Sequence, residues 1–251
     1  MKRLYLYILL LVAVLALMAA LRFCVPAGSA PVPAHSGGDT IDVAIEYSPT
    51  YCYTYADTLG GFHYDMMRSV ARKLRRPVTF HPLVSVQKAI ADLNAGAFDI
   101  VIMQYPMTKE NLEFLEFTNP VSLDRQILVQ RKDSTGAVPA ASQLSLARDT
   151  VWVVKDSPMK SRIQDLSHEI GDTIFVREDS AYGPEQLFLR VAAGEIKFAV
   201  INESIARSLA QEYPLVDFST GISFTQYQPW ICRKGNTALR DSLNKYIEPL
   251  R

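Results

Sequence analysis

The fold is decided by the stretch Leu93-Asn94-Ala95-Gly96-Ala97-Phe98-Asp99-Ile100-Val101-Ile102-Met103-Gln104. The same pattern of residue types recurs in a second stretch, Val191-Ala192-Ala193-Gly194-Glu195-Ile196-Lys197-Phe198-Ala199-Val200-Ile201-Asn202. In each copy an amphipathic helix is predicted to end at the glycine, because glycine tolerates the left-handed conformation that closes a helix. Two residues later an apolar run of strand length begins, apolar on both faces as in a covered parallel strand. Each run leads to a polar amide, Gln104 or Asn202.

The position of these two amides predicts a binding cleft. In open α/β sheets, ligands bind outside the carboxyl ends of the strands, where the strand order reverses. Two such units predict two α/β lobes that face each other across a cleft, with Gln104 and Asn202 on opposite walls. This layout is typical of a binding protein.

The amino-terminal segment indicates export from the cytoplasm. Lys2-Arg3 precedes an uncharged run from Leu4 to Leu21, which is just long enough to span a bilayer as a helix. We interpret residues 1–24 as a signal peptide or a membrane anchor, and both alternatives remain open. Residues 25–40 are rich in Pro, Gly and small polar residues and are predicted to be a linker.

Composition narrows the function classes. The 251 residues carry 26 basic and 26 acidic side chains, without a basic stripe, so we expect no nucleic-acid partner. The three cysteines, Cys24, Cys52 and Cys232, have no metal-ligand spacing, and we expect neither a metal nor a cofactor. Export would permit a disulfide between Cys52 and Cys232, but two unpaired, partly buried thiols are the favoured interpretation.

The order of predicted elements suggests that the chain crosses between lobes twice, near Ser122–Gln126 and near Ile222–Gln226. The first lobe is therefore expected to comprise residues 41–124 and 223–251, and the second residues 125–222. Two crossing segments form a hinge, and a hinge beside a cleft permits closure on a ligand.

Several polar and aromatic side chains are expected near this cleft. Tyr47 and Tyr51 lie in a tyrosine-rich loop after the first predicted strand, where rings can stack on a ligand and hydroxyls can bind it. Ser85 is expected to cap the helix that ends at Gly96. Thr108 is expected to cap a short helix whose free backbone amides suit an anionic ligand group.

Four short sequence motifs resemble those of the family 3 extracellular solute-binding proteins, which have the periplasmic-binding-protein type II fold. They are Gly61-Phe62-His63-Tyr64-Asp65, Gly96-Ala97-Phe98-Asp99, Phe117-Thr118-Asn119-Pro120 and Trp230-Ile231-Cys232-Arg233-Lys234. The resemblance covers nearly all of residues 41–249 and implies an α/β, two-lobed fold. Residues 178–202 and 222–226 also resemble the binding module of membrane-bound lytic murein transglycosylase F. Because the chain ends at Arg251, the resemblance implies a binding module without that enzyme's catalytic domain.

The resemblance also implies how the cleft would differ from its relatives. Amino-acid-binding members hold the ligand carboxylate with an arginine and its ammonium with an aspartate, and here the matching residues are Asn111 and Asn202. Pro106 replaces a usual hydroxyl residue, and Asp156-Ser157 replaces a usual Gly-Thr or Gly-Ser pair. Charge-assisted hydrogen bonds contribute about 1.5–3 kcal/mol each, so free amino acids should bind weakly. The ligand-binding residues predicted from loop positions and from the resemblance are Tyr47, Tyr51, Phe62, Gln104, Thr108, Asn111, Ser157 and Asn202.

Three functions follow from these observations. The first is an exported binding protein that closes on a small polar ligand, such as an amino-acid-like molecule, a peptide or a muropeptide. Its expected partners are a transporter permease or a murein hydrolase, and the inner membrane through the amino-terminal segment. The second is a regulatory module of murein metabolism with a vestigial cleft. The third is an enzyme, which is disfavoured because no motif pairs a histidine with a nucleophile or carboxylate; the histidines are His35, His63, His81 and His168.

Overall fold

The computed structural model describes residues 39–56 and 58–250. The predicted signal or anchor and almost all of the predicted linker lie outside the described residues. Within the described ranges, no helix is both long and apolar enough to cross a membrane.

The first sheet has five strands in the order β4-β1-β5-β14-β6. β1 pairs in parallel with β4 and β5, whereas β14 pairs antiparallel with β5 and β6. The strand between β5 and β6 therefore comes from the C-terminal part of the chain. The strands are β1 (Ile41–Glu46), β4 (Val78–Leu83), β5 (Ile100–Ile102), β6 (Leu115–Phe117) and β14 (Ile231–Arg233).

The second sheet repeats this pattern with the order β10-β9-β11-β8-β12. β9 pairs in parallel with β10 and β11, and β8 pairs antiparallel with β11 and β12. Each copy of the repeated phrase thus supplies the central strand of a five-stranded sheet, β5 or β11. The strands are β8 (Gln126–Arg131), β9 (Thr150–Val154), β10 (Phe175–Asp179), β11 (Phe198–Asn202) and β12 (Val216–Asp217).

Helices cover both faces of each sheet, which gives four apolar clusters. On the first sheet, α2 and α8 pack against one face and α3 against the other. On the second sheet, α5 packs against one face, and α6 and α7 against the other. The helices are α2 (Phe62–Leu74), α3 (Val86–Ala95), α4 (Lys109–Phe114), α5 (Pro158–Ile170), α6 (Pro184–Ala193), α7 (Glu203–Leu209) and α8 (Thr237–Ile247), with 3₁₀ turns at Gln143–Leu146, Ala210–Glu212 and Glu248–Leu250.

The predicted helix ends are confirmed by the backbone geometry. Gly96 and Gly194 both adopt the left-handed conformation, with φ of 88° and 80°. The Gly96 N–H donates to the Leu93 carbonyl, and the Gly194 N–H donates to the Val191 carbonyl. At the other end of α3, the Ser85 hydroxyl accepts the Lys88 N–H, as a helix N-cap should.

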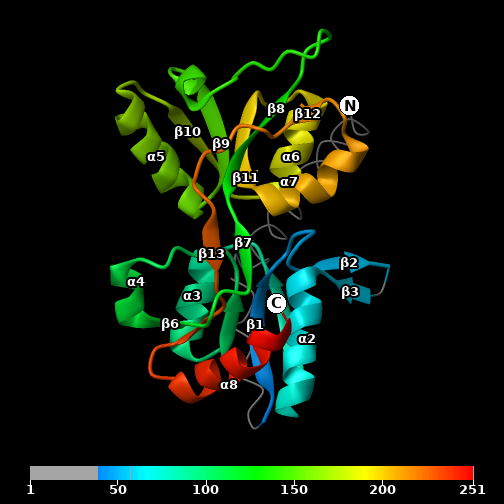
Figure 1. Cartoon of the computed structure of the whole chain (residues 1–251), viewed down its shortest axis with the longest axis vertical. Coiled ribbons are helices and arrows are strands. Elements are labelled where there is room, and N and C mark those ends of the chain that lie inside the picture. Colours follow the sequence, from blue (N-terminus) through cyan, green and yellow to red (C-terminus); the bar gives the residue numbers. More distant parts are fainter. Residues whose placement is uncertain (1–38, 57, 251) are drawn as a thin grey trace, which may run out of the picture. The chain divides into compact units, whose positions relative to one another are not determined.

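Two strands connect the sheets. β7 (Ser122–Asp124) lies between β6 and β8 in the chain, and β13 (Gln226–Gln228) lies between β12 and β14. They pair antiparallel with each other (Figure 1). The chain therefore passes twice between the sheets, near both predicted crossings, while the lobe boundaries at 124 and 223 stay a prediction.

Two local details differ from the sequence prediction. The strand predicted at residues 78–80 extends as β4 to Leu83 and includes Pro82. Proline is tolerated because β4 is an edge strand and needs no donor on its free side. The tyrosine-rich segment also continues into a hairpin of β2 (Tyr53–Tyr55) and β3 (Thr58–Gly60).

Candidate functional site

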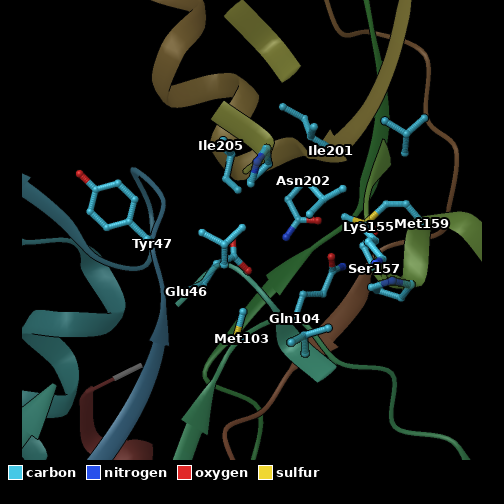
Figure 2. Close-up of a pocket in the computed structure, with 16 residues that line it drawn as sticks. Glu46, Tyr47, Met103, Gln104, Lys155, Ser157, Met159, Ile201, Asn202 and Ile205 are labelled. Atoms are coloured by element: carbon cyan, nitrogen blue, oxygen red, sulfur yellow. The ribbon is translucent and has the colours of Figure 1, made fainter. Parts of the chain in front are cut away.

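A pocket lies at the carboxyl ends of strands from both sheets (Figure 2). Its volume is about 40 Å³, measured as the space open to the centre of a water molecule. A water molecule needs about 10–15 Å³ of such space, so the pocket holds a few waters or one small chemical group. The lining residues are Glu46, Tyr47, Val84, Val86, Met103, Gln104, Val154, Lys155, Ser157, Pro158, Met159, Pro184, Val200, Ile201, Asn202 and Ile205.

The amides that end the two repeated phrases meet in this pocket. Gln104 follows β5 and Asn202 is the last residue of β11, and both side chains are buried. Among the described residues, neither polar atom of the Gln104 amide has a hydrogen-bond partner, and neither has Asn202 Oδ1. Burying an amide without a partner costs about 1–3 kcal/mol, which a ligand that bonds to it can recover.

Ser157 and Tyr47 line the same pocket. Ser157 precedes Pro158, the first residue of α5, and its hydroxyl makes no capping bond. This buried hydroxyl also has no partner in the part of the chain that the structure describes. Tyr47 follows β1 directly and is partly exposed. Four of the eight predicted binding residues thus come together, and their role in binding stays a prediction.

Tyr51 and Phe62 lie outside this lining and pack around a buried histidine. The Tyr51 ring stacks on His63 with centroids 4.4 Å apart, and Phe62 meets His63 edge-on at 5.2 Å. The Trp230 indole N–H donates to His63 Nδ1 over 3.2 Å. Burial lowers the pKa of His63 to about 3, so this histidine is a neutral part of the core.

Thr108 and Asn111 also lie outside the lining and build the turn before α4. The Thr108 hydroxyl accepts the Asn111 N–H, which confirms the predicted cap. The Asn111 amide donates to the Pro106 carbonyl over 2.7 Å, and its oxygen accepts the Tyr105 hydroxyl. In this structure the Asn111 side chain is therefore occupied by its own loop.

Sequence reasoning missed two charged residues of the pocket, Glu46 and Lys155. Glu46 is the last residue of β1 and Lys155 is the first after β9, so each sits at the carboxyl end of a strand. Burial raises the pKa of the Glu46 carboxyl to about 7, and the negative charge of Asp124 acts in the same direction. The strand-end rule that found Gln104 and Asn202 would have found both.

Two further acidic side chains, Glu203 and Asp42, are engaged by basic partners outside the pocket lining. Glu203, the acid next to Asn202, begins α7 and is bound by Arg125 Nε at 2.6 Å and by Arg207 Nη2 at 2.7 Å. His81 lies against Asp42, with Nε2 and Oδ1 3.1 Å apart. Among the described residues, no group of three His, Cys, Asp or Glu side chains could hold a metal ion.

The cysteines in the described ranges are free. Cys52 and Cys232 are both unpaired, and both are fully buried, whereas the favoured interpretation expected partly buried thiols. Burial raises the pKa of the Cys232 thiol to about 12, which keeps it protonated and unreactive. Cys24 lies outside the described residues.

A family model and two similar proteins match most of this chain. The family model for bacterial extracellular solute-binding proteins, family 3, matches residues 40–251. A membrane-bound lytic murein transglycosylase F of Desulfosudis oleivorans is 26% identical over 84% of this chain and 45% of its own length. One of Aeromonas hydrophila is 23% identical over 77% of this chain and 38% of its length. The chain thus spans less than half the length of these relatives.

Solved structures show the same fold. An ancestral arginine-binding protein bound to arginine gives a TM-score of 0.73 at 22% identity, covering 85% of this chain and 92% of that one. The holo arginine-binding protein of T. maritima gives 0.71 at 21% identity, covering 84% and 90%. An ancestral amino-acid-binding protein, a precursor of cyclohexadienyl dehydratase, gives 0.70 at 20% identity, covering 84% and 89%. At these identities the likeness concerns the fold alone.

Proposed function

This chain belongs to the bacterial extracellular solute-binding proteins, family 3, with the two-lobed type II binding fold, and we propose that it is a non-catalytic envelope protein that closes its cleft on a small polar ligand. The observation that carries this proposal is the set of polar side chains without partners in the pocket. Gln104, Ser157 and Asn202 come from both sheets, line one cavity, and keep four buried polar atoms without a partner among the described residues. A ligand would satisfy these atoms and join the two sheets.

The strands β7 and β13 would act as the hinge. Asp124, at the end of β7, accepts the Ser204 hydroxyl at 2.5 Å and the Ser204 N–H at 3.2 Å, which ties the strand to the start of α7. The next residue, Arg125, forms the ion pair with Glu203. Since α7 starts directly after Asn202, movement at the hinge and ligand contact at Asn202 would be mechanically coupled.

Free amino acids are not the expected ligands, although several similar structures are amino-acid-binding proteins. The resemblance matches the two charged anchors to Asn111 and Asn202, which are neutral amides, and of these Asn202 lines the pocket. Amides both donate and accept hydrogen bonds, so a ligand that presents amide or hydroxyl groups suits the pocket amides of Gln104 and Asn202 better. The small cavity also means that a muropeptide could enter only if the lobes separate further.

The direct test is isothermal titration calorimetry of the full-length chain in detergent against the twenty amino acids, short peptides and muropeptides. We expect binding of a peptide or amide ligand that Gln104→Met abolishes without loss of the folded state. The matched control is Gln130→Met at a buried glutamine outside the pocket, which should lower stability and leave ligand affinity unchanged in the folded fraction. Micromolar binding of free amino acids would contradict the proposed ligand class, and no binding at all would contradict the binding function.

A second candidate is a regulatory or interaction module of murein metabolism with a vestigial cleft. The similarity to two lytic murein transglycosylases F favours it. The partner would then be a murein hydrolase, whereas the binding function would use a transporter permease. Adding the pure chain to a transglycosylase that digests murein sacculi separates the two: a changed digestion rate without ligand binding supports the module. Digestion by the chain alone, lost on Glu203→Gln, would show that it is an enzyme.

The proposal also includes a location at the inner membrane. Family membership indicates a place in the cell envelope. The uncharged run from Leu4 to Leu21 would either tether the chain or be removed after export. Fractionation of cells, with the mass of the mature protein, distinguishes these alternatives.

A further inference from the structure

The carboxyl-terminal half of α2 carries a cluster of exposed basic residues. Arg68 and Arg72 lie one turn apart on the face of the helix that points away from the core. Lys73 follows in the last turn, and Arg75 is the C-cap, with φ of 56°. All four residues are exposed, and we name this cluster the α2 basic patch.

The charges of the α2 basic patch are not neutralised by acidic side chains. In the part of the chain that the structure describes, none of its four members forms an ion pair, although Asp65 lies on the same helix. Arg72 Nη2 donates to the neutral Ser69 hydroxyl at 3.2 Å, and the Arg68 guanidinium lies over the Tyr64 ring, 5.4 Å from its centroid. The helix dipole favours cations in the last turn, but Arg68 lies a turn earlier. Capping therefore does not account for the whole patch.

The patch lies at the end of the first sheet that is opposite the pocket. α2 runs from the hairpin of β2 and β3 toward the end of the sheet where β1 begins (Figure 1). Just after the helix, Arg76 Nε donates to the Asp39 carbonyl at 2.8 Å and pairs with the Asp39 carboxylate at 3.0 Å. Asp39 is the first residue that the structure describes, so the chain enters the folded domain beside the patch.

An anionic lipid bilayer fits this patch. Its headgroups present a layer of phosphates, and each Lys or Arg near such a surface strengthens binding about fivefold. The guanidinium group matches phosphate oxygens with paired donors. A nucleic acid fits less well, because the cluster is confined to one helix end and does not form a stripe along the surface. Contact with a bilayer at this end also leaves the pocket, at the carboxyl ends of the strands, open to a ligand.

We propose that the α2 basic patch docks the folded domain on the phosphate headgroups of an anionic bilayer. This contact goes beyond the tether considered above, because the folded domain itself makes it. The inference rests on the proposed location in the envelope and not on the ligand-binding function. If the run from Leu4 to Leu21 is retained as an anchor, residues 22–38 can span at most about 60 Å, which keeps the patch at a high effective concentration near the membrane.

The test measures how far a bilayer protects Arg72 from a water-soluble, arginine-specific dicarbonyl reagent. The full-length chain is assembled with nanodiscs of phosphatidylcholine alone, or of equal parts phosphatidylcholine and phosphatidylglycerol, and modification is followed by peptide mass spectrometry. We expect Arg72 to react at least about threefold more slowly on the anionic discs. Arg177, exposed on β10 of the second sheet, should react equally on both. About 1 M salt, at which the Debye length is about 3 Å, should remove the protection.

Matched charge variants locate the contact. Arg68→Gln/Lys73→Gln removes two charges from the patch, keeps Arg72 as the reporter and should abolish its protection. The control Lys109→Gln/Arg148→Gln removes one lysine and one arginine at exposed positions elsewhere and should leave the protection unchanged.

Equal reactivity of Arg72 on the two kinds of disc, or protection that survives the patch variant, would overturn this proposal and leave the binding function standing. Protection by soluble murein fragments without protection by the anionic discs would assign the patch to another polyanion and would also overturn it. The location in the envelope is tested separately by the cell fractionation.

Discussion

Two buried glutamines provide an internal test of whether the pocket is built for a ligand. Gln130 Nε2 donates to the Ala140 carbonyl at 2.8 Å and to Asp217 at 3.1 Å, and its oxygen accepts the Ala140 N–H at 2.8 Å. Gln104 is buried too, yet neither of its amide atoms has a partner among the described residues. Methionine matches glutamine in length and removes only the amide. Gln104→Met and Gln130→Met should therefore change stability in opposite directions.

The magnitudes follow from the hydrogen-bond inventory. An unpartnered buried amide costs about 1–3 kcal/mol, and Gln104→Met removes this cost. Water in the cavity recovers part of it, so we expect a gain near the lower end, about 1 kcal/mol in the free energy of unfolding. Gln130→Met instead leaves the Ala140 N–H and carbonyl without their partner and should lower the free energy of unfolding by about 2 kcal/mol or more.

Urea denaturation of the ligand-free chain, followed by circular dichroism, measures both changes at one pH. In thermal unfolding, the same change of 1 kcal/mol in the free energy of unfolding would shift Tm by about 2–4 °C for a chain of this size. The gain at Gln104 should come with loss of ligand binding, which is the expected compromise at a functional site. If Gln104→Met destabilises the chain as much as Gln130→Met does, the Gln104 amide has a structural role, and our argument for the pocket is refuted.

Three further predictions test other parts of the structure. Because the pKa of Glu46 is raised to about 7, ionisation of this carboxyl opposes folding. The Glu46→Gln variant should therefore match the parent chain in urea midpoint near pH 4 and become the more stable of the two as pH rises through 7. A difference in urea midpoint that does not change with pH would contradict the raised pKa. Hydrogen bonds from the Ser48 side chain and the Gln104 backbone lower the pKa of this carboxyl, and the negative charge of Asp124 raises it. Gly194→Ala should lower the free energy of unfolding by about 1–2 kcal/mol, because φ is 80° and the new Cβ would lie 3.1 Å from Arg131 Nη1. An unchanged urea midpoint would argue against a left-handed helix cap at this position. Cys232 should resist a thiol reagent at pH 8 until denaturant is added, and rapid labelling of the folded chain would show that it is accessible.

The sequence by itself determined the fold class and its internal repeat. Helix periodicity, the glycines at 96 and 194 and the caps at Ser85 and Thr108 are local signals, because each depends on residues within one or two helical turns. The apolar runs that follow the glycines became the central strands of two equivalent sheets. The strand-end rule uses only positions along the chain, and the two amides that it selects, Gln104 and Asn202, line one pocket.

Only the tertiary structure decided which polar groups are free for a ligand. Asn111 and Tyr51 are candidates by position, but Asn111 bonds its own loop and Tyr51 stacks on His63 in the core. Glu46 looks like an ordinary strand-end acid, and its pKa is raised because segments distant in the chain enclose it, with Asp124 nearby. Hydrogen-bond satisfaction and desolvation depend on neighbours brought together by folding, so no pattern along the chain records them.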